Sequence, residues 1–257
     1  MLTKIPILTA LIFSAVYPLC FWISANDPIK NKFHRFHLGL PNCVGGLAVV
    51  LLLFMPVSLV IKILAVLWKI FFFYISRGHW RKETIDVRKV TLPCVLGIVI
   101  FLLVQNELIG PGIEKGILGI LAGGILCASI YAMNLGHWYL NVHGLPIHHL
   151  MRSVYVFWVL LALRFIWDLY VMGTHWTIHA GDHIPLYRFA LTLDGFLLLT
   201  GIFFGTFLPI LLLYFVRGTL LVKSTQSATG ILYVILIAIF MGDLAYKYYL
   251  MKYGIVL

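Results

Sequence analysis

The feature that most constrains this sequence is a series of apolar runs, each long enough to cross a lipid bilayer. A membrane-spanning helix needs about 20 mostly apolar residues. Seven segments meet that requirement, at residues 5–24, 44–61, 90–108, 112–143, 148–173, 186–216 and 225–249. The sequence therefore predicts an all-α fold, a polytopic transmembrane helix bundle of about seven spans. We expect residues 1–257 to form a single integral membrane domain.

Composition supports a membrane protein and bears on its partners. The 257 residues are 62% hydrophobic and 11% charged, whereas soluble domains are about half apolar and a quarter charged. The formal net charge of +10 is typical of basic loops held on the cytoplasmic side of a membrane. We therefore expect the lipid bilayer as the main partner, and no nucleic acid.

The distribution of basic residues predicts an orientation. With seven spans, one side collects eleven of the nineteen Lys and Arg residues, including the dense group at 77–89. The positive-inside rule then places the N-terminus in the cytoplasm, and we expect a bacterial inner (cytoplasmic) membrane. Pro56 predicts a kink with helix continuing past it. Residues 62–75 can leave the bilayer or turn back through it, which would change the span count and the orientation.

Histidines gather at two places in this hydrophobic chain. One group lies at the end of the fourth apolar run and the start of the fifth: His137, His143, His148 and His149. The other lies beyond the far end of the fifth run, at His175, His179 and His183, and seven spans place His34 and His37 on that same side. At about 1.5 Å per helical residue, His149 and His175 would be about 39 Å apart. The two groups would therefore serve separate sites, one near each membrane face.

Imidazole is the usual protein ligand for haem iron, zinc and copper, so these groups predict a cofactor. For b-type haem we expect His137 to pair with His149 at the inner face. At the outer face we expect His175 or His179 to pair with His37. Alternatively, the inner group alone (His137, His143, His148 and His149) holds a metal ion without porphyrin. A third interpretation places these imidazoles, with neighbouring Trp and Tyr, in an aromatic belt at the headgroups.

Small residues recur every fourth position in the fourth apolar run, at Gly124, Ala128, Ala132 and Gly136. Such a spacing puts them on one helix face. That face allows close approach of either another helix or a flat cofactor.

Ionisable residues inside the apolar runs form a further signal. Arg164 and Asp168 are one helical turn apart and can pair. Asp194 is expected inside the sixth run, and Asp243 inside the seventh, one turn from Lys247. Charges at such depth mark proton, ion or quinone paths, or they bridge helices.

Together these patterns predict a membrane subunit of an electron-transfer complex that binds b-type haem and uses quinone as its substrate. Because the chain has no soluble domain, other subunits would deliver its electrons. The alternatives are a histidine-ligated, metal-dependent membrane enzyme and a transporter or structural subunit without cofactor. The sequence has no Walker loop, G-x-S-x-G elbow or dinucleotide fingerprint, so nucleotide-driven transport by this chain alone, serine hydrolysis and nicotinamide chemistry have no support.

Overall fold

The computed structural model describes residues 3–30, 32–142 and 144–257. Within these residues, eight helices are long and apolar enough to cross a membrane. The predicted helical membrane bundle is thus confirmed, with one span more than expected. The chain forms two compact units, Met1–Cys127 and Ala128–Leu257, and the boundary falls inside one continuous helix.

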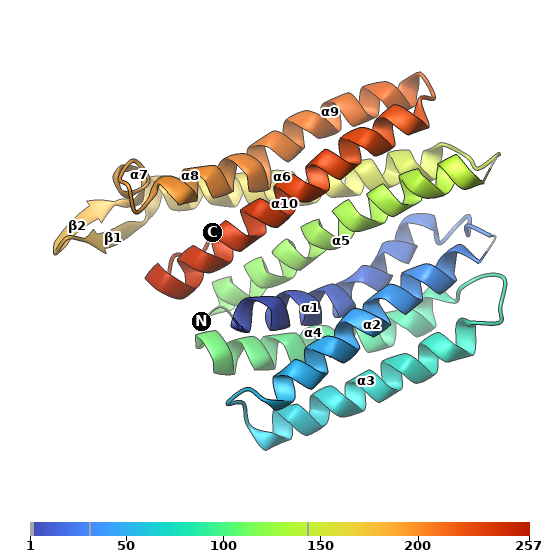
Figure 1. Ribbon diagram of the computed structural model, residues 1–257, viewed down its shortest axis with the longest axis horizontal. Helices are drawn as coiled ribbons and strands as arrows, with labels where there is room; N and C mark the ends of the chain where they lie inside the picture. Colours follow the sequence, from blue (N-terminus) through green and yellow to red (C-terminus); the bar gives the residue numbers. More distant parts are fainter. Residues whose placement is uncertain (1–2, 31, 143) are drawn as a thin grey trace. The chain divides into compact units, whose positions relative to one another are not determined.

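The first unit is built from helices that run side by side (Figure 1). They are α1 (Lys4–Val16) with its 3-10 extension η1 (Tyr17–Ser24), α2 (Phe33–Leu53), α3 (Leu59–His79), α4 (Val87–Ile109) and the first part of α5 (Ile113–Asn141). Helix α1 packs against α2 and α4, and α3 packs against the same two helices. The switch to 3-10 geometry coincides with Pro18, which has no N–H to donate to an α-helical hydrogen bond.

Small residues let α1 approach its neighbours closely. A Cβ added at Gly45 of α2 would lie 2.2 Å from Ser14 Oγ, and one at Gly97 of α4 would lie 2.8 Å from Ala15 Cβ. Ser14 also donates a hydrogen bond to the carbonyl of Pro41 at 2.7 Å. The core of this unit therefore depends on close backbone contact in addition to the burial of large side chains.

The additional span is α3, in the region whose path the sequence leaves open. Pro56 lies in the connection between α2 and α3, not within a kinked helix. Lys69 lies inside α3, and its Nζ donates to Asn42 Oδ1 of α2 at 2.5 Å. Because this contact gives the ammonium group a hydrogen-bond acceptor within the unit, a helix that carries a lysine can still be membrane-spanning.

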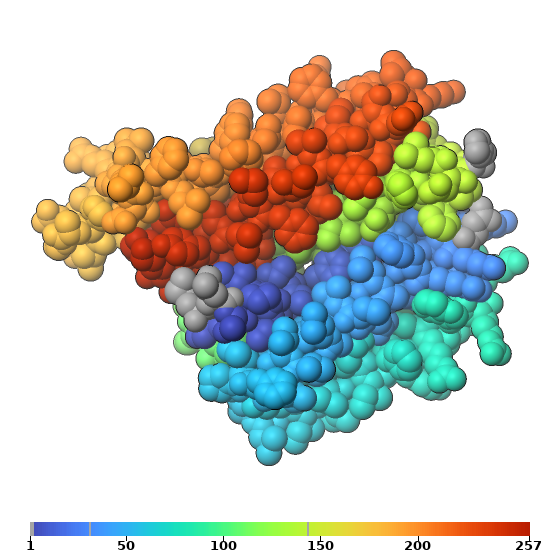
Figure 2. All heavy atoms as spheres, viewed as in Figure 1, coloured from blue at the N-terminus to red at the C-terminus, as the bar shows by residue number. Residues whose placement is uncertain are grey.

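The second unit begins with the rest of α5. It continues with α6 (His148–Thr174), β1 (Trp176–His179), β2 (Asp182–Pro185), α7 (Leu186–Phe189), α8 (Phe196–Ile202), the π-helical turn η2 (Phe203–Phe207), α9 (Leu208–Leu221) and α10 (Thr225–Tyr253). Helix α10 packs against α8, η2 and α9, and α6 packs against α9. Strands β1 and β2 form an antiparallel hairpin, which lies with α7 at one end of this unit (Figure 2).

The sixth apolar run folds differently from the single helix expected over 186–216. Helix α7 has four residues, a turn follows, and the span itself covers Phe196–Leu221. Gly195 closes the turn, where a Cβ would lie 1.9 Å from the carbonyl oxygen of Phe189. Only glycine fits that approach, so the helix restarts after it.

A π-helical turn interrupts this span immediately before Pro209. A proline ring clashes with the carbonyl four residues earlier in an α-helix, which here belongs to Gly205. Gly205 also meets Gly242 of α10, where an added Cβ would lie 2.1 Å from the Gly205 Cα. This close crossing brings η2 and α10 together beside α6.

Candidate functional site

The centre of the second unit holds a buried ion pair. Arg164 Nε lies 3.3 Å from Asp168 Oδ1, and the two side chains are 3% and 1% exposed. Both residues are on α6, one turn apart, as the sequence predicts. A buried charge is tolerated only when it is paired and hydrogen-bonded, so the surroundings of this pair decide its chemistry.

Two hydroxyl groups complete the surroundings of Asp168. Thr206 Oγ1 of η2 and the Tyr246 hydroxyl of α10 each lie 2.8 Å from Asp168 Oδ2, and they lie 2.7 Å from one another. With Asp168 ionised, two hydroxyl hydrogens serve these three contacts, since each hydroxyl carries one. One contact is therefore left without a hydrogen, and this triangle of three oxygen atoms, from Asp168, Thr206 and Tyr246, can take up one more proton.

Arg164 is held from two further directions. Its guanidinium lies over the Tyr246 ring, 4.1 Å from the ring centroid, a cation–π geometry. Its Nη2 donates to the carbonyl of Leu257, and the neighbouring Trp167 donates to the carbonyl of Val256 at 3.1 Å. We call Arg164, Asp168, Thr206 and Tyr246 the α6 polar cluster.

The other two predicted acidic residues lie apart from this cluster. Asp243 forms an ion pair with Lys247 on α10. Asp194 is not inside a span: it lies in the turn before α8, its side chain is 56% exposed, and it is 3.7 Å from His179 Nδ1. The four predicted pathway residues thus occupy three separate places.

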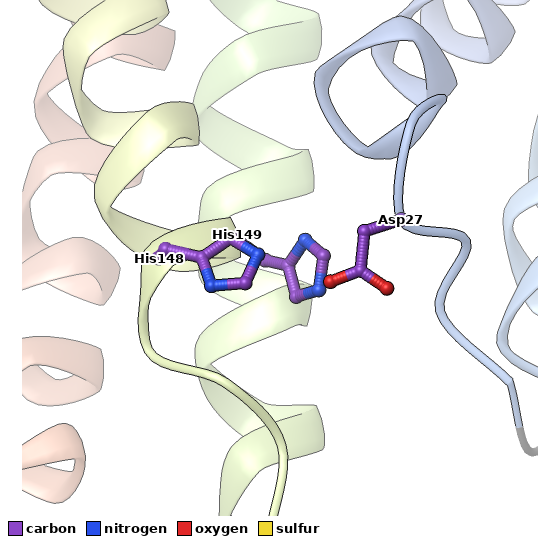
Figure 3. A group of neighbouring side chains, drawn as sticks. All are labelled: Asp27, His148 and His149. Carbon is purple, nitrogen blue, oxygen red and sulfur yellow. The ribbon is translucent and has the colours of Figure 1, made fainter.

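Two of the predicted inner histidines are neighbours. His148 and His149 open α6 (Figure 3), with ring centroids 4.2 Å apart. His149 is 2% exposed, whereas His137, on the last turns of α5, is exposed. His143 falls outside the described residues. Among the residues that are described, His137 does not join His148 and His149 as a three-ligand group for one ion.

The predicted outer histidines His175, His179 and His183 belong to the hairpin and its start. His183 is opposite Ile178 in the register, and His179 is opposite Asp182. Because side chains alternate across a strand, His179 and His183 are on opposite faces of the ribbon. His175 lies 3.1 Å from Thr174 Oγ1 through its Nδ1. The three imidazoles therefore do not converge on one point.

His37 belongs to the first unit, on the early part of α2. It is buried, and its Nδ1 lies 2.8 Å from the Tyr17 hydroxyl. Aromatic rings surround it, with Phe33 at 4.0 Å and Phe36 at 5.3 Å between centroids. This environment is that of a packed aromatic cluster.

The stripe of small residues on α5 is divided between the units. Gly124 belongs to the first, and Ala128, Ala132 and Gly136 belong to the second. At Gly136 the neighbour is helix α10, since an added Cβ would lie 2.6 Å from Thr229 Oγ1. This end of the stripe serves helix packing.

Sequence reasoning did not single out two buried histidines of the first unit as a pair. His34 Nε2 donates to the carbonyl of His79 at 3.1 Å, and His79 Nδ1 donates to the carbonyl of Ile75 at 2.8 Å. The remaining ring nitrogens, His34 Nδ1 and His79 Nε2, are buried without a hydrogen-bond partner in the described structure. No sequence pattern marks this pair, because His34 and His79 are 45 residues apart.

Comparison with protein-family models, with curated proteins and with solved structures found no match. We therefore infer the function from the residues themselves. In the second unit these residues are the α6 polar cluster and, at the start of α6, the neighbouring imidazoles of His148 and His149.

Proposed function

We propose that the protein is a membrane subunit of a quinone-linked electron-transfer complex in a bacterial inner membrane, with b-type haem bound through histidine. The observation behind this proposal is His149, a buried imidazole on the first turn of a membrane helix, with His148 beside it. Histidine within a membrane helix is rare and often functional, and imidazole is the usual protein ligand for haem iron. His149 would hold the haem iron, with His137 as the candidate for the second ligand.

The α6 polar cluster supports the quinone part of the proposal. Quinone reduction takes up two protons for every two electrons, so a quinone site needs groups that accept and release protons inside the membrane. The triangle of Asp168, Thr206 and Tyr246 has a place for one additional proton. Arg164 beside it stabilises the anionic state that follows proton release.

The experiment is an absorption spectrum of the purified full-length chain, before and after reduction with dithionite. We expect a reduced-minus-oxidised band of b-type haem that is lost in His149→Ala. His183→Ala is the matched control, because His183 is exposed on the hairpin. Absence of the band and of extractable porphyrin from the wild-type protein would rule out haem binding.

A second candidate is a transporter or structural membrane subunit without cofactor. It is favoured by the contacts of Arg164 and Asp168, which form an ion pair with each other and hydrogen bonds to Thr206, Tyr246 and a backbone carbonyl. Under this alternative, the sole role of the cluster is to join α6, η2 and α10. Under this alternative, alanine at His137 and His149 leaves both spectrum and activity unchanged. Stoichiometric iron, zinc or copper without porphyrin would instead favour a metal-dependent membrane enzyme.

Eight crossings also change the expected orientation. One side then collects eleven of the nineteen basic residues: Lys30, Lys32, Arg35, Arg77, Arg81, Lys82, Arg88, Lys89, Arg152, Arg217 and Lys223. These residues lie in or beside the connections between η1 and α2, α3 and α4, α5 and α6, and α9 and α10. The positive-inside rule places this side in the cytoplasm. We therefore propose that the N-terminus faces outward, the reverse of the seven-span expectation.

A further inference from the structure

We propose that the cavity between the end of α3 and the start of α4 binds the phosphomonoester group of an anionic membrane lipid. This cavity has a volume of about 660 Å³, and its lining includes Arg77, His79, Trp80, Arg81, Lys82 and Lys89. The cavity lies within the first unit, so lipid binding there is independent of the proposed redox function.

The charge of the cavity favours an anion. Arg77, Arg81 and Lys82 form no ion pair within the described part of the chain. Lys89 is partly offset by Asp86, 3.6 Å away. Desolvation raises the pKa of Asp86, but its bonds to the Lys89 backbone and ammonium together lower the pKa below its usual value. Three uncompensated cations around one cavity would repel a metal ion and attract a phosphate.

A buried histidine adds a reason to prefer a phosphomonoester. His79 Nδ1 donates to the Ile75 carbonyl, so in the neutral ring Nε2 carries a lone pair. That nitrogen is buried and has no hydrogen-bond partner in the described structure, and His79 lines the cavity. A phosphomonoester can carry a P–OH hydrogen for Nε2 to accept, whereas an ionised phosphodiester cannot.

Exposed aromatic residues indicate that the ligand comes from the bilayer. Tyr74 and Trp80 line the cavity and are 72% and 45% exposed. Tyr74 lies on the last turns of a membrane helix and Trp80 directly follows it. Tyr and Trp at such positions lie at the depth of the lipid headgroups. The cavity therefore opens where a lipid phosphate is located.

The experiment counts lipids retained by the purified full-length protein, using native mass spectrometry. The probes are phosphatidic acid, phosphatidylglycerol and phosphatidylcholine with matched acyl chains. We expect phosphatidic acid to be retained most strongly. In Arg81→Gln/Lys82→Gln, retention should weaken about five-fold for each charge removed, since one basic residue near a membrane surface contributes about 1 kcal/mol.

The matched control is Arg217→Gln/Lys223→Gln, which removes the same charge from the second unit. Its retention of phosphatidic acid should equal that of the wild type. Equal retention of phosphatidic acid and phosphatidylglycerol by the wild type would overturn the proposal, as would an equal loss in the control variant. Inorganic phosphate without lipid tests a soluble source. A melting temperature raised by phosphate and insensitive to lipid identity would overturn the lipid as occupant.

Discussion

Tyr246 of α10 contacts Asp168 of α6 through its hydroxyl, at 2.8 Å from Oδ2, while its ring lies under the guanidinium of Arg164. One side chain thus contacts both members of a buried ion pair. The hydroxyl stabilises the carboxylate by a hydrogen bond, and the ring face attracts the cation. Removing either charge alone should leave its partner buried without a counter-charge.

We expect Asp168→Asn to destabilise the protein strongly. The amide keeps an acceptor for Thr206 and Tyr246 but removes the charge that compensates Arg164, which is 2% exposed. Loss of one member of a buried pair costs about 3–5 kcal/mol. The measurement is the thermal melting temperature of the purified protein in a lipid nanodisc. Asp243→Asn, in the more exposed pair with Lys247, should have a clearly smaller effect.

The double variant Arg164→Met/Asp168→Leu removes both charges of this pair. It should recover a large part of the stability lost in Asp168→Asn, because apolar replacement of a buried ion pair is often neutral. A double variant less stable than the single one would show that the hydroxyl contacts, not the charges, dominate the α6 polar cluster.

We expect Gly242→Ala to separate α10 from η2. An added Cβ would lie 2.1 Å from the Gly205 Cα, a backbone atom that cannot move aside by changing rotamer. Overpacking of this kind costs about 1–3 kcal/mol. Gly230→Ala is the control on the same helix, because nothing lies within 4 Å of its added Cβ. Equal melting temperatures for the two variants would contradict the close helix crossing.

Lys69 and Asn42 should respond unequally to substitution. Asn42→Leu leaves the ammonium of Lys69 without its 2.5 Å acceptor, whereas Lys69→Met removes the charge itself. Because an unpaired charge within a membrane is costly, Asn42→Leu should lower the melting temperature more than Lys69→Met. The combined variant should resemble Lys69→Met. The reverse order would argue that α3 does not cross the membrane.

The proposed orientation is tested by thiol labelling of intact cells. In a background without native cysteines, Glu114→Cys should react with a membrane-impermeant maleimide. Asn26→Cys, in the connection between η1 and α2, should react only after permeabilisation. Glu114 lies outside in both topologies and is the accessible control, whereas Asn26 lies outside with seven spans and in the cytoplasm with eight. Labelling of Asn26→Cys in intact cells would favour the seven-span orientation.

The helical class and most spans were predictable because apolar runs of about 20 residues can satisfy their backbone in lipid only as helices. The path of residues 62–75 could not be predicted, because Lys62 and Lys69 interrupt the apolar stretch there. The sequence does not show that Asn42 accepts a hydrogen bond from Lys69. The boundary between the two units has no linker signal, since it lies within α5.

The candidate site was predictable only where its residues are close in sequence. Arg164 and Asp168 follow helical spacing, and the structure shows their contact. Thr206 and Tyr246 lie 38 and 78 residues beyond Asp168, so only the fold brings them together. Asp194 was expected inside a span because the sequence does not show the turn that ends at Gly195. In that turn a Cβ added to Gly195 would lie 1.9 Å from the carbonyl oxygen of Phe189.

The placement of Arg164 and Asp168 on a single helix has a consequence for biogenesis. During synthesis α6 leaves the ribosome before Thr206 and Tyr246 exist, so neither hydroxyl is present when the segment enters the translocon. Opposite charges one turn apart cancel locally, and α6 can partition into lipid as a nearly neutral segment. With one of the two charges on a different helix, the folded cluster could be the same. However, the first helix to insert would then carry an unpaired charge in the hydrocarbon until the second helix arrived.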